Sequence, residues 1–132
     1  MNHIENTAVT TAVEAAEILA HAIQATPEWE EFQSSQGTFE RDTEVQELIS
    51  RYRQLAQLWR AAQQRGQGLM GKAAMELPRL QSQIEANANY QRQQGAGRAV
   101  VALLQKVNQA ISTELGLDFA GNAAPRGGGC CG

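Results

Sequence analysis

Two adjacent cysteines, Cys130 and Cys131, stand in the final Gly-Gly-Gly-Cys-Cys-Gly segment and are the only cysteines in the chain. A buried structural cysteine needs an ordered backbone around it, and a glycine run does not provide one. We therefore expect both thiols to be reachable from outside the fold. A disulfide between them would be strained, because neighbouring Cα atoms are only about 3.8 Å apart, less than a disulfide normally spans.

Two thiolates on a flexible tail suit a soft metal or an iron-sulfur centre, so we predict Cys130 and Cys131 to be metal and cofactor ligands. Such a centre takes about four ligands, and the others would come from a second copy, another protein or a small thiol. Two other interpretations stay open. The tail is inert and disordered with incidental thiols, or it is prenylated, although the prenylation motif needs cysteine where Gly129 stands.

Residues suited to acid-base catalysis are few. The only histidines are His3 and His21, and neither has a partner at a spacing typical of catalysis or metal binding. The acidic group Glu28, Glu30 and Glu31 falls where a helix would begin, and carboxylates there stabilise the helix dipole. The sequence contains no His-Glu-x-x-His, Glu-x-x-His or Cys-x-x-Cys motif. We predict that the protein is not an enzyme.

Composition indicates one globular domain. The 132 residues are 42% hydrophobic and 19% charged, with a formal net charge of -3. A pI near 5.4 disfavours a protein that grips nucleic-acid phosphates, so we expect no direct nucleic-acid binding. The arginines Arg51, Arg53, Arg60 and Arg65 follow two glutamates, a mixture typical of a solvated helix face. Residues 1–25 lack the features of a signal peptide, and no stretch has the ~20 apolar residues of a transmembrane segment, which predicts a cytoplasmic protein.

Apolar residues recur every three or four positions, which predicts helices and no strands. Thr26 and Asp42 are expected N-caps, with Pro27 in the first turn of its helix and Pro78 bending a later one. The glycine-containing segment 87–97 reads as a long break. The predicted helices cover residues 8–25, a short stretch after Pro27, 43–64, 70–84 and 100–115.

The predicted fold is all-α, an antiparallel helical hairpin or bundle of about five helices that forms an oligomer. We expect a disordered N-terminus (1–7), a helical domain (8–118) and a flexible glycine-rich tail with the cysteine pair (119–132). The helix over 43–64 has the longest apolar stripe and carries Tyr52 and Trp59. It is therefore the predicted centre of the core.

Three segments together resemble the YlbF/YmcA family of bacterial regulators. They are residues 21–32 (HAIQATPEWEEF), 42–49 (DTEVQELI) and 84–90 (IEANANY), followed by the apolar stripe of the last helix. The resemblance covers approximately residues 8–115 and lies in the order and spacing of helix patterns. Some members of the family also end in a glycine-rich segment with cysteines.

The resemblance implies a small helical protein that forms homo- or hetero-oligomers with related helical proteins. Certain members join a complex that carries 4Fe-4S clusters, supports sporulation, competence and biofilm formation, and works with the endoribonuclease RNase Y in mRNA processing. By this analogy Cys130 and Cys131 are ligands of a 4Fe-4S cluster shared with another chain. The alternative from a different class is a structural helical dimer or assembly module with an inert tail.

Overall fold

The computed structural model describes residues 2–68 and 71–125 of the 132-residue chain. Within these ranges the chain forms six helices and no strand, which confirms the predicted all-α class. The helices are α1 (Asn2–Gln24), α2 (Pro27–Arg41), α3 (Thr43–Gln64), α4 (Lys72–Ala86), α5 (Ala88–Leu115) and α6 (Phe119–Ala123).

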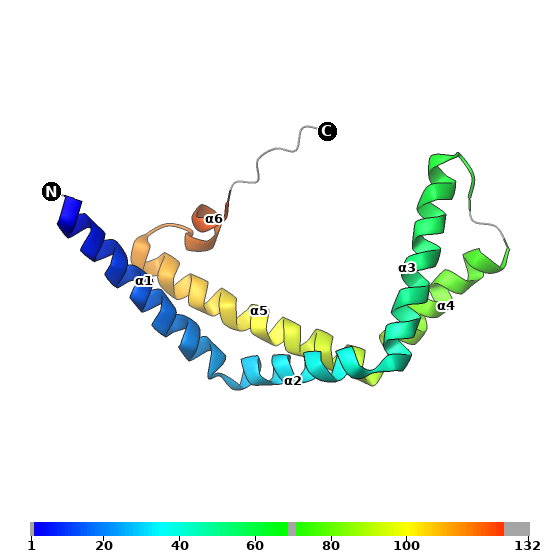
Figure 1. Ribbon diagram of the computed structural model, residues 1–132, viewed down its shortest axis with the longest axis horizontal. Helices are drawn as coiled ribbons and strands as arrows, with labels where there is room; N and C mark the ends of the chain where they lie inside the picture. The colour runs from blue at the N-terminus through cyan, green and yellow to red at the C-terminus, as the bar shows by residue number, and fades with distance from the viewer. Residues whose placement is uncertain (1, 69–70, 126–132) are drawn as a thin grey trace.

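The helices form an open arc rather than a closed bundle (Figure 1). The middle of the arc is α2 packed against the first half of α5, and this is the most extensive helix-helix contact. The hairpin of α3 and α4 rises at one end. At the other end lie α1, the second half of α5 and the short helix α6.

Capping residues determine where α2 and α3 begin, and both starts agree with the prediction. The Thr26 hydroxyl accepts a hydrogen bond from the Trp29 amide at 3.3 Å, and Pro27 occupies the first turn of α2. The Asp42 carboxylate accepts one from the Val45 amide at 3.2 Å and begins α3. Both side chains satisfy amides that have no partner within their own helix. As predicted, α3 covers residues 43–64.

The prediction of a break over residues 87–97 is wrong, because α5 begins at Ala88 and continues through Gly95 and Gly97. Each glycine weakens an isolated helix by about 1 kcal/mol. Packing against α2 compensates, since Ala96 is buried and a Cβ on Gly97 would lie 3.9 Å from the Phe32 ring. Packing against α2 therefore keeps α5 helical through both glycines. α2 also contains a glycine, Gly37, in its interior.

One predicted segment boundary falls inside a helix and the other at the start of a helix. The boundary between residues 7 and 8 lies within α1, which begins at Asn2. The segment 119–132 begins with α6, which is held to α5 by side-chain acceptors. Ser112 Oγ accepts from the Phe119 amide at 2.9 Å, and Asn108 Oδ1 accepts from the Ala120 amide at 3.0 Å.

Among the described residues, the buried apolar side chains are few: Val45, Leu80, Ile84, Ala96 and Val100. This set overturns the prediction that α3 is the centre of the core, because four of the five come from α4 and α5. Outward from Val45 along α3, burial decreases until Trp59 is 40% exposed. The predicted apolar stripe is present on α3, but among the described helices the one that packs along it is α4 alone.

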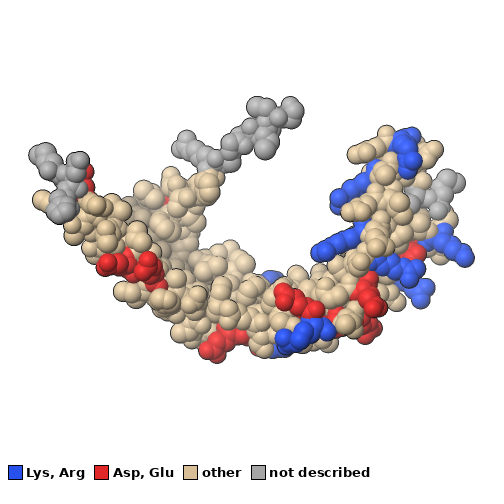
Figure 2. All heavy atoms as spheres, in the orientation of Figure 1, with Lys and Arg blue, Asp and Glu red and all other residues tan. Residues whose placement is uncertain are grey.

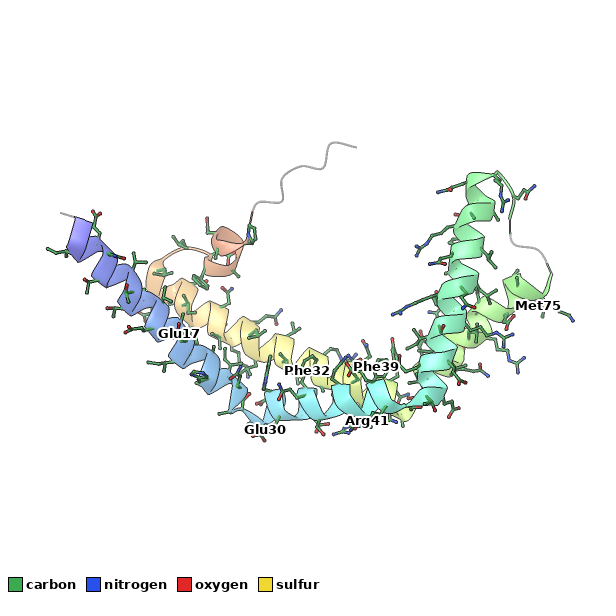
Figure 3. The ribbon with its side chains drawn as sticks, viewed as in Figure 1. Glu17, Glu30, Phe32, Phe39, Arg41 and Met75 are labelled. Atoms are coloured by element: carbon green, nitrogen blue, oxygen red, sulfur yellow. The ribbon has the colours of Figure 1, made fainter. Side chains whose placement is uncertain are left out.

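Figure 3 shows that aromatic and charged side chains lie on opposite faces of α2. Phe32 and Phe39 are directed toward α5, whereas Glu30 and Arg41 point away from it. The Phe39 ring lies 6.2 Å from that of Tyr90 on α5, within the range of favourable aromatic contact. Ser35 is fully buried between these rings along the helix, and its hydroxyl donates to the Phe32 carbonyl at 2.9 Å. A small side chain at position 35 suits the packing of α2 against α5.

Candidate functional site

The predicted ligands Cys130 and Cys131 lie outside the described residues. Within the part of the chain that the structure describes, no three His, Cys, Asp or Glu residues come close enough to hold a metal ion. Both histidines belong to α1, where His21 is exposed in the last turn. Glu28 and Glu30 occupy the first turn of α2, as expected for carboxylates at a helix N-terminus.

Three polar side chains meet where the helical hairpins join: Asp42, Asn87 and Asn89, which we name the junction cluster. Asp42 stands in the turn between α2 and α3, and Asn87 in the turn between α4 and α5. Asp42 Oδ2 accepts hydrogen bonds from Asn87 Nδ2 at 3.1 Å and from Asn89 Nδ2 at 2.9 Å. Its Oδ1 remains on the Val45 amide. One carboxylate therefore ties together the two turns where four helices meet.

Asn87 has a second role as the N-cap of α5. Its Oδ1 accepts from the Tyr90 amide at 2.9 Å while its Nδ2 donates to Asp42. On the other side of the junction, Gln46 Nε2 donates to the Phe39 carbonyl at 2.9 Å, which satisfies an acceptor at the end of α2. The cluster thus fixes the ends of helices as well as the contact between them.

These hydrogen bonds lower the pKa of Asp42. The bond from Asn89 has the largest effect, followed by those from Asn87 and the Val45 amide. All three donors favour the ionised carboxylate. No cation pairs with Asp42 among the described residues, so neutral amides alone hold its charge.

A second polar group joins α2 to α5 further along the same interface. Arg92 donates from Nε to Glu31 Oε1 at 2.6 Å and from a terminal nitrogen to Oε2 at 3.1 Å, a bidentate arrangement. The same guanidinium reaches Ser34 at 3.2 Å. The pair lowers the pKa of Glu31 and raises that of Arg92, in both cases chiefly through their shared hydrogen bonds. Both side chains are exposed, so the pair orients the helices more than it stabilises them.

The junction cluster was not predicted from the sequence, although its members were in view. Asp42 was identified as a cap, but Asn87 and Asn89 were assigned to a break. Their separation from Asp42 by 45 and 47 residues left no local sign of contact. The available signal was an asparagine before a run of helix-forming residues, which is typical of an N-cap.

An open groove of about 680 Å³ lies between α3 and α4. Its charged lining includes Glu44, Glu47, Lys72 and Arg79, and Arg51 and Glu76 form an ion pair across it. Met75 at its edge is 79% exposed (Figure 3). Mixed charge in an open groove suits a protein surface better than a small ligand, for which an enclosed apolar pocket is usual.

The fold and these sites define a class: a small elongated all-α protein whose helical hairpins are joined by polar side chains at their turns. A protein-family model described as "Control of competence regulator ComK, YlbF/YmcA" matches residues 12–116. The chain therefore belongs to the YlbF/YmcA family of competence regulators. No curated protein and no solved structure matches it. The three segments that carried the resemblance are brought together around the α2–α5 interface and its junction cluster.

Proposed function

We propose that this chain is a non-enzymatic regulatory adaptor that acts inside a cytoplasmic protein complex. In that complex it modulates RNase Y-dependent mRNA processing and, through it, cell-fate decisions such as sporulation, competence and biofilm formation. The observation that carries the proposal is the match to the YlbF/YmcA family model over residues 12–116. None of the described helices is apolar enough over a sufficient length to cross a membrane.

Exposed apolar side chains support a docking role for the helical body. They lie on α1, at the outer end of α3 and over the second half of α5 with α6. A monomer rarely leaves so many large apolar groups in water without a partner. They are Val9, Val13, Ile18, Leu58, Trp59, Val101, Leu104, Leu115, Leu117 and Phe119.

The proposal assigns Cys130 and Cys131 to a 4Fe-4S cluster shared with another chain. Thiolates are the usual cluster ligands, and two of them leave about two positions for a partner. The partners are related helical proteins, in homo- or hetero-oligomers, together with RNase Y. Direct nucleic-acid contact by this chain is not part of the proposal.

The test replaces both cysteines with serine and measures iron and output together. The C130S/C131S variant should keep its helicity and oligomeric state, lose iron on anaerobic purification from its native cell, and alter the processing of RNase Y substrate transcripts. A matched control, G127S/G128S, adds two serines to the same segment and keeps both thiols, so it should bind iron normally. Full iron content in the cysteine variant would remove the tail from the mechanism.

The competing function is a structural helical dimer or assembly module with an inert tail. The extended surface of the body is compatible with it. Wild-type protein that is colourless both alone and with co-purified partners, and whose loss leaves RNase Y substrates unchanged, would favour the assembly module. Visible absorption with bound iron, together with RNase Y among the captured proteins, would favour the adaptor.

A further inference from the structure

Charged residues are divided between the two ends of the arc. Residues 2–40, which form α1 and most of α2, contain seven glutamates and no Lys or Arg, and we name them the acidic limb. Residues 50–83, which form most of the α3–α4 hairpin, contain six Lys or Arg residues and one glutamate, and we name them the basic limb. Figure 2 shows acidic side chains over α1 and α2 and most basic side chains over the hairpin.

Most charges on the two limbs form no ion pair with any residue that the structure describes. Two ion pairs occur among the described residues, Arg51 with Glu76 and Arg92 with Glu31. The other basic residues of the basic limb are exposed and belong to neither pair. They are Arg53, Arg60, Arg65, Lys72 and Arg79.

The two limbs attract opposite charge but cannot satisfy each other within one chain. α1 and the α3–α4 hairpin lie at opposite ends of the α2–α5 pair (Figure 1), and charges further apart than about 8–10 Å are largely screened at physiological salt. Concentrated charge of one sign raises the local potential and selects a surface of the other sign. A second copy of the chain offers such a surface for each limb: its basic limb for the acidic limb, and its acidic limb for the basic limb.

The exposed area also calls for a partner of substantial size. The chain exposes 10379 Å². A compact monomer of 14.3 kDa exposes about 6,800 Å². Two chains together carry an excess of roughly 7,000 Å², which is enough to supply the total of about 2,000–5,000 Å² that the two partners of a permanent dimer bury.

We infer that two copies of this chain form a two-fold dimer in which the acidic limb of each copy contacts the basic limb of the other. A two-fold axis makes both contacts equivalent, so every limb is paired and the assembly closes at two chains. The inference rests on the homo-oligomer in the proposed function and specifies its interface.

Apolar side chains among the charges supply the buried centre that such an interface needs. Val9 and Val13 are exposed on the acidic limb, and Leu58 and Trp59 on the basic limb. Tryptophan is among the residues that contribute most to binding when desolvated. In the dimer these groups lose contact with water, while the surrounding opposite charges set orientation and partner choice.

Charge reversal on each limb tests the pairing. R53E/R60E places glutamates at positions seven apart on one face of α3, and E14R/E17R places arginines at positions three apart on one face of α1. All four residues are exposed, so the helices should remain intact. Each variant alone should dimerise about tenfold or more weakly than wild type in sedimentation equilibrium.

Mixing the two variants provides the decisive measurement. In the heterodimer one pair of limbs is unchanged, and in the other pair the new arginines on α1 meet the new glutamates on α3, so an equimolar mixture should associate near wild-type affinity. The matched control R98E/K106E changes net charge as much as R53E/R60E does, but on exposed positions of α5, and its dimer should be unaffected. Raising the salt concentration should weaken the wild-type dimer and the mixed heterodimer alike.

Several outcomes would overturn the inference. A wild-type chain that stays monomeric at high micromolar concentration has no such dimer. A dimer unchanged by both reversals, or a mixture that fails to restore association, places the interface elsewhere. If R53E/R60E abolishes binding of a labelled single-stranded RNA oligonucleotide and leaves the dimer intact, the basic limb serves nucleic acid instead. These measurements use the purified chain alone, so their failure leaves the cysteine and RNase Y tests of the adaptor role independent.

Discussion

Replacing Asn87 and Asn89 separately by alanine measures how the junction cluster holds two turns together. N89A removes one hydrogen bond to Asp42. N87A removes a similar bond and also the N-cap acceptor for the Tyr90 amide. The two variants therefore share one loss and differ by a cap.

The expected difference follows from that comparison. Loss of an N-cap costs about 1 kcal/mol. Alanine inside the first turn of α5 at position 89 also recovers up to about 0.7 kcal/mol of helix propensity. N87A should then be less stable than N89A by roughly 1–2 kcal/mol. For a chain of this length the corresponding difference in melting temperature is about 3–8 °C.

The assay is urea unfolding followed by circular dichroism at 222 nm, with all variants at one protein concentration because association shifts apparent stability. Q57A, at an exposed position of α3, is the control and should change stability by less than about 0.5 kcal/mol. If N89A were as destabilising as N87A, the cap on α5 would contribute nothing and the account of Asn87 would be wrong.

Three further predictions concern packing, pH and the arginine pair. In urea titrations of the monomer, L80A should lower the free energy of unfolding by about 2–5 kcal/mol, because Leu80 is 4% exposed. The control L58A, at a position 59% exposed, should change it by less than about 1 kcal/mol. Because folding lowers the pKa of Asp42, its ionised carboxylate contributes its full stabilisation above the ordinary pKa of 3.8. This contribution is lost as the pH falls through the lower pKa of the folded state. In acid titrations the difference in stability between wild type and D42N should therefore shrink below about pH 4. R92K should lower the melting temperature slightly more than E31Q does, because lysine cannot form the bidentate bond and also loses the contact to Ser34; equal melting temperatures for R92K and wild type would show that the pair has no effect.

The sequence was sufficient to predict structure wherever the determining interactions are local. Thr26 with Pro27, and Asp42 before an uninterrupted apolar stripe, are signals that act within four residues, and the corresponding helix starts were confirmed. The break at Gly95 and Gly97 was wrong for the opposite reason. The helix continues through them because α5 packs against α2, which lies some 60 residues earlier and places Phe32 beside Gly97.

The candidate sites divide in the same way. Cys130 and Cys131 stand out by residue type alone, and their role stays a prediction because they lie outside the described residues. The junction cluster depends on two turns meeting, which no pattern within either turn specifies. The exposure of Trp59 was also beyond the sequence, since an apolar stripe shows which face avoids water but not whether one chain or two cover it.

The junction cluster also determines how the opening of the arc can change. Because α3 and α5 both start within two residues of the same carboxylate contacts, the direction of the hairpin relative to the α2–α5 pair depends on two short turns. Inserting one residue after Asp42 would turn every side chain of α3 by about 100° around the helix axis. A different face of α3 would then be directed across the opening, and Val45 would leave its buried position. The length of the turn at Asp42 therefore determines which face of α3 is directed into the arc.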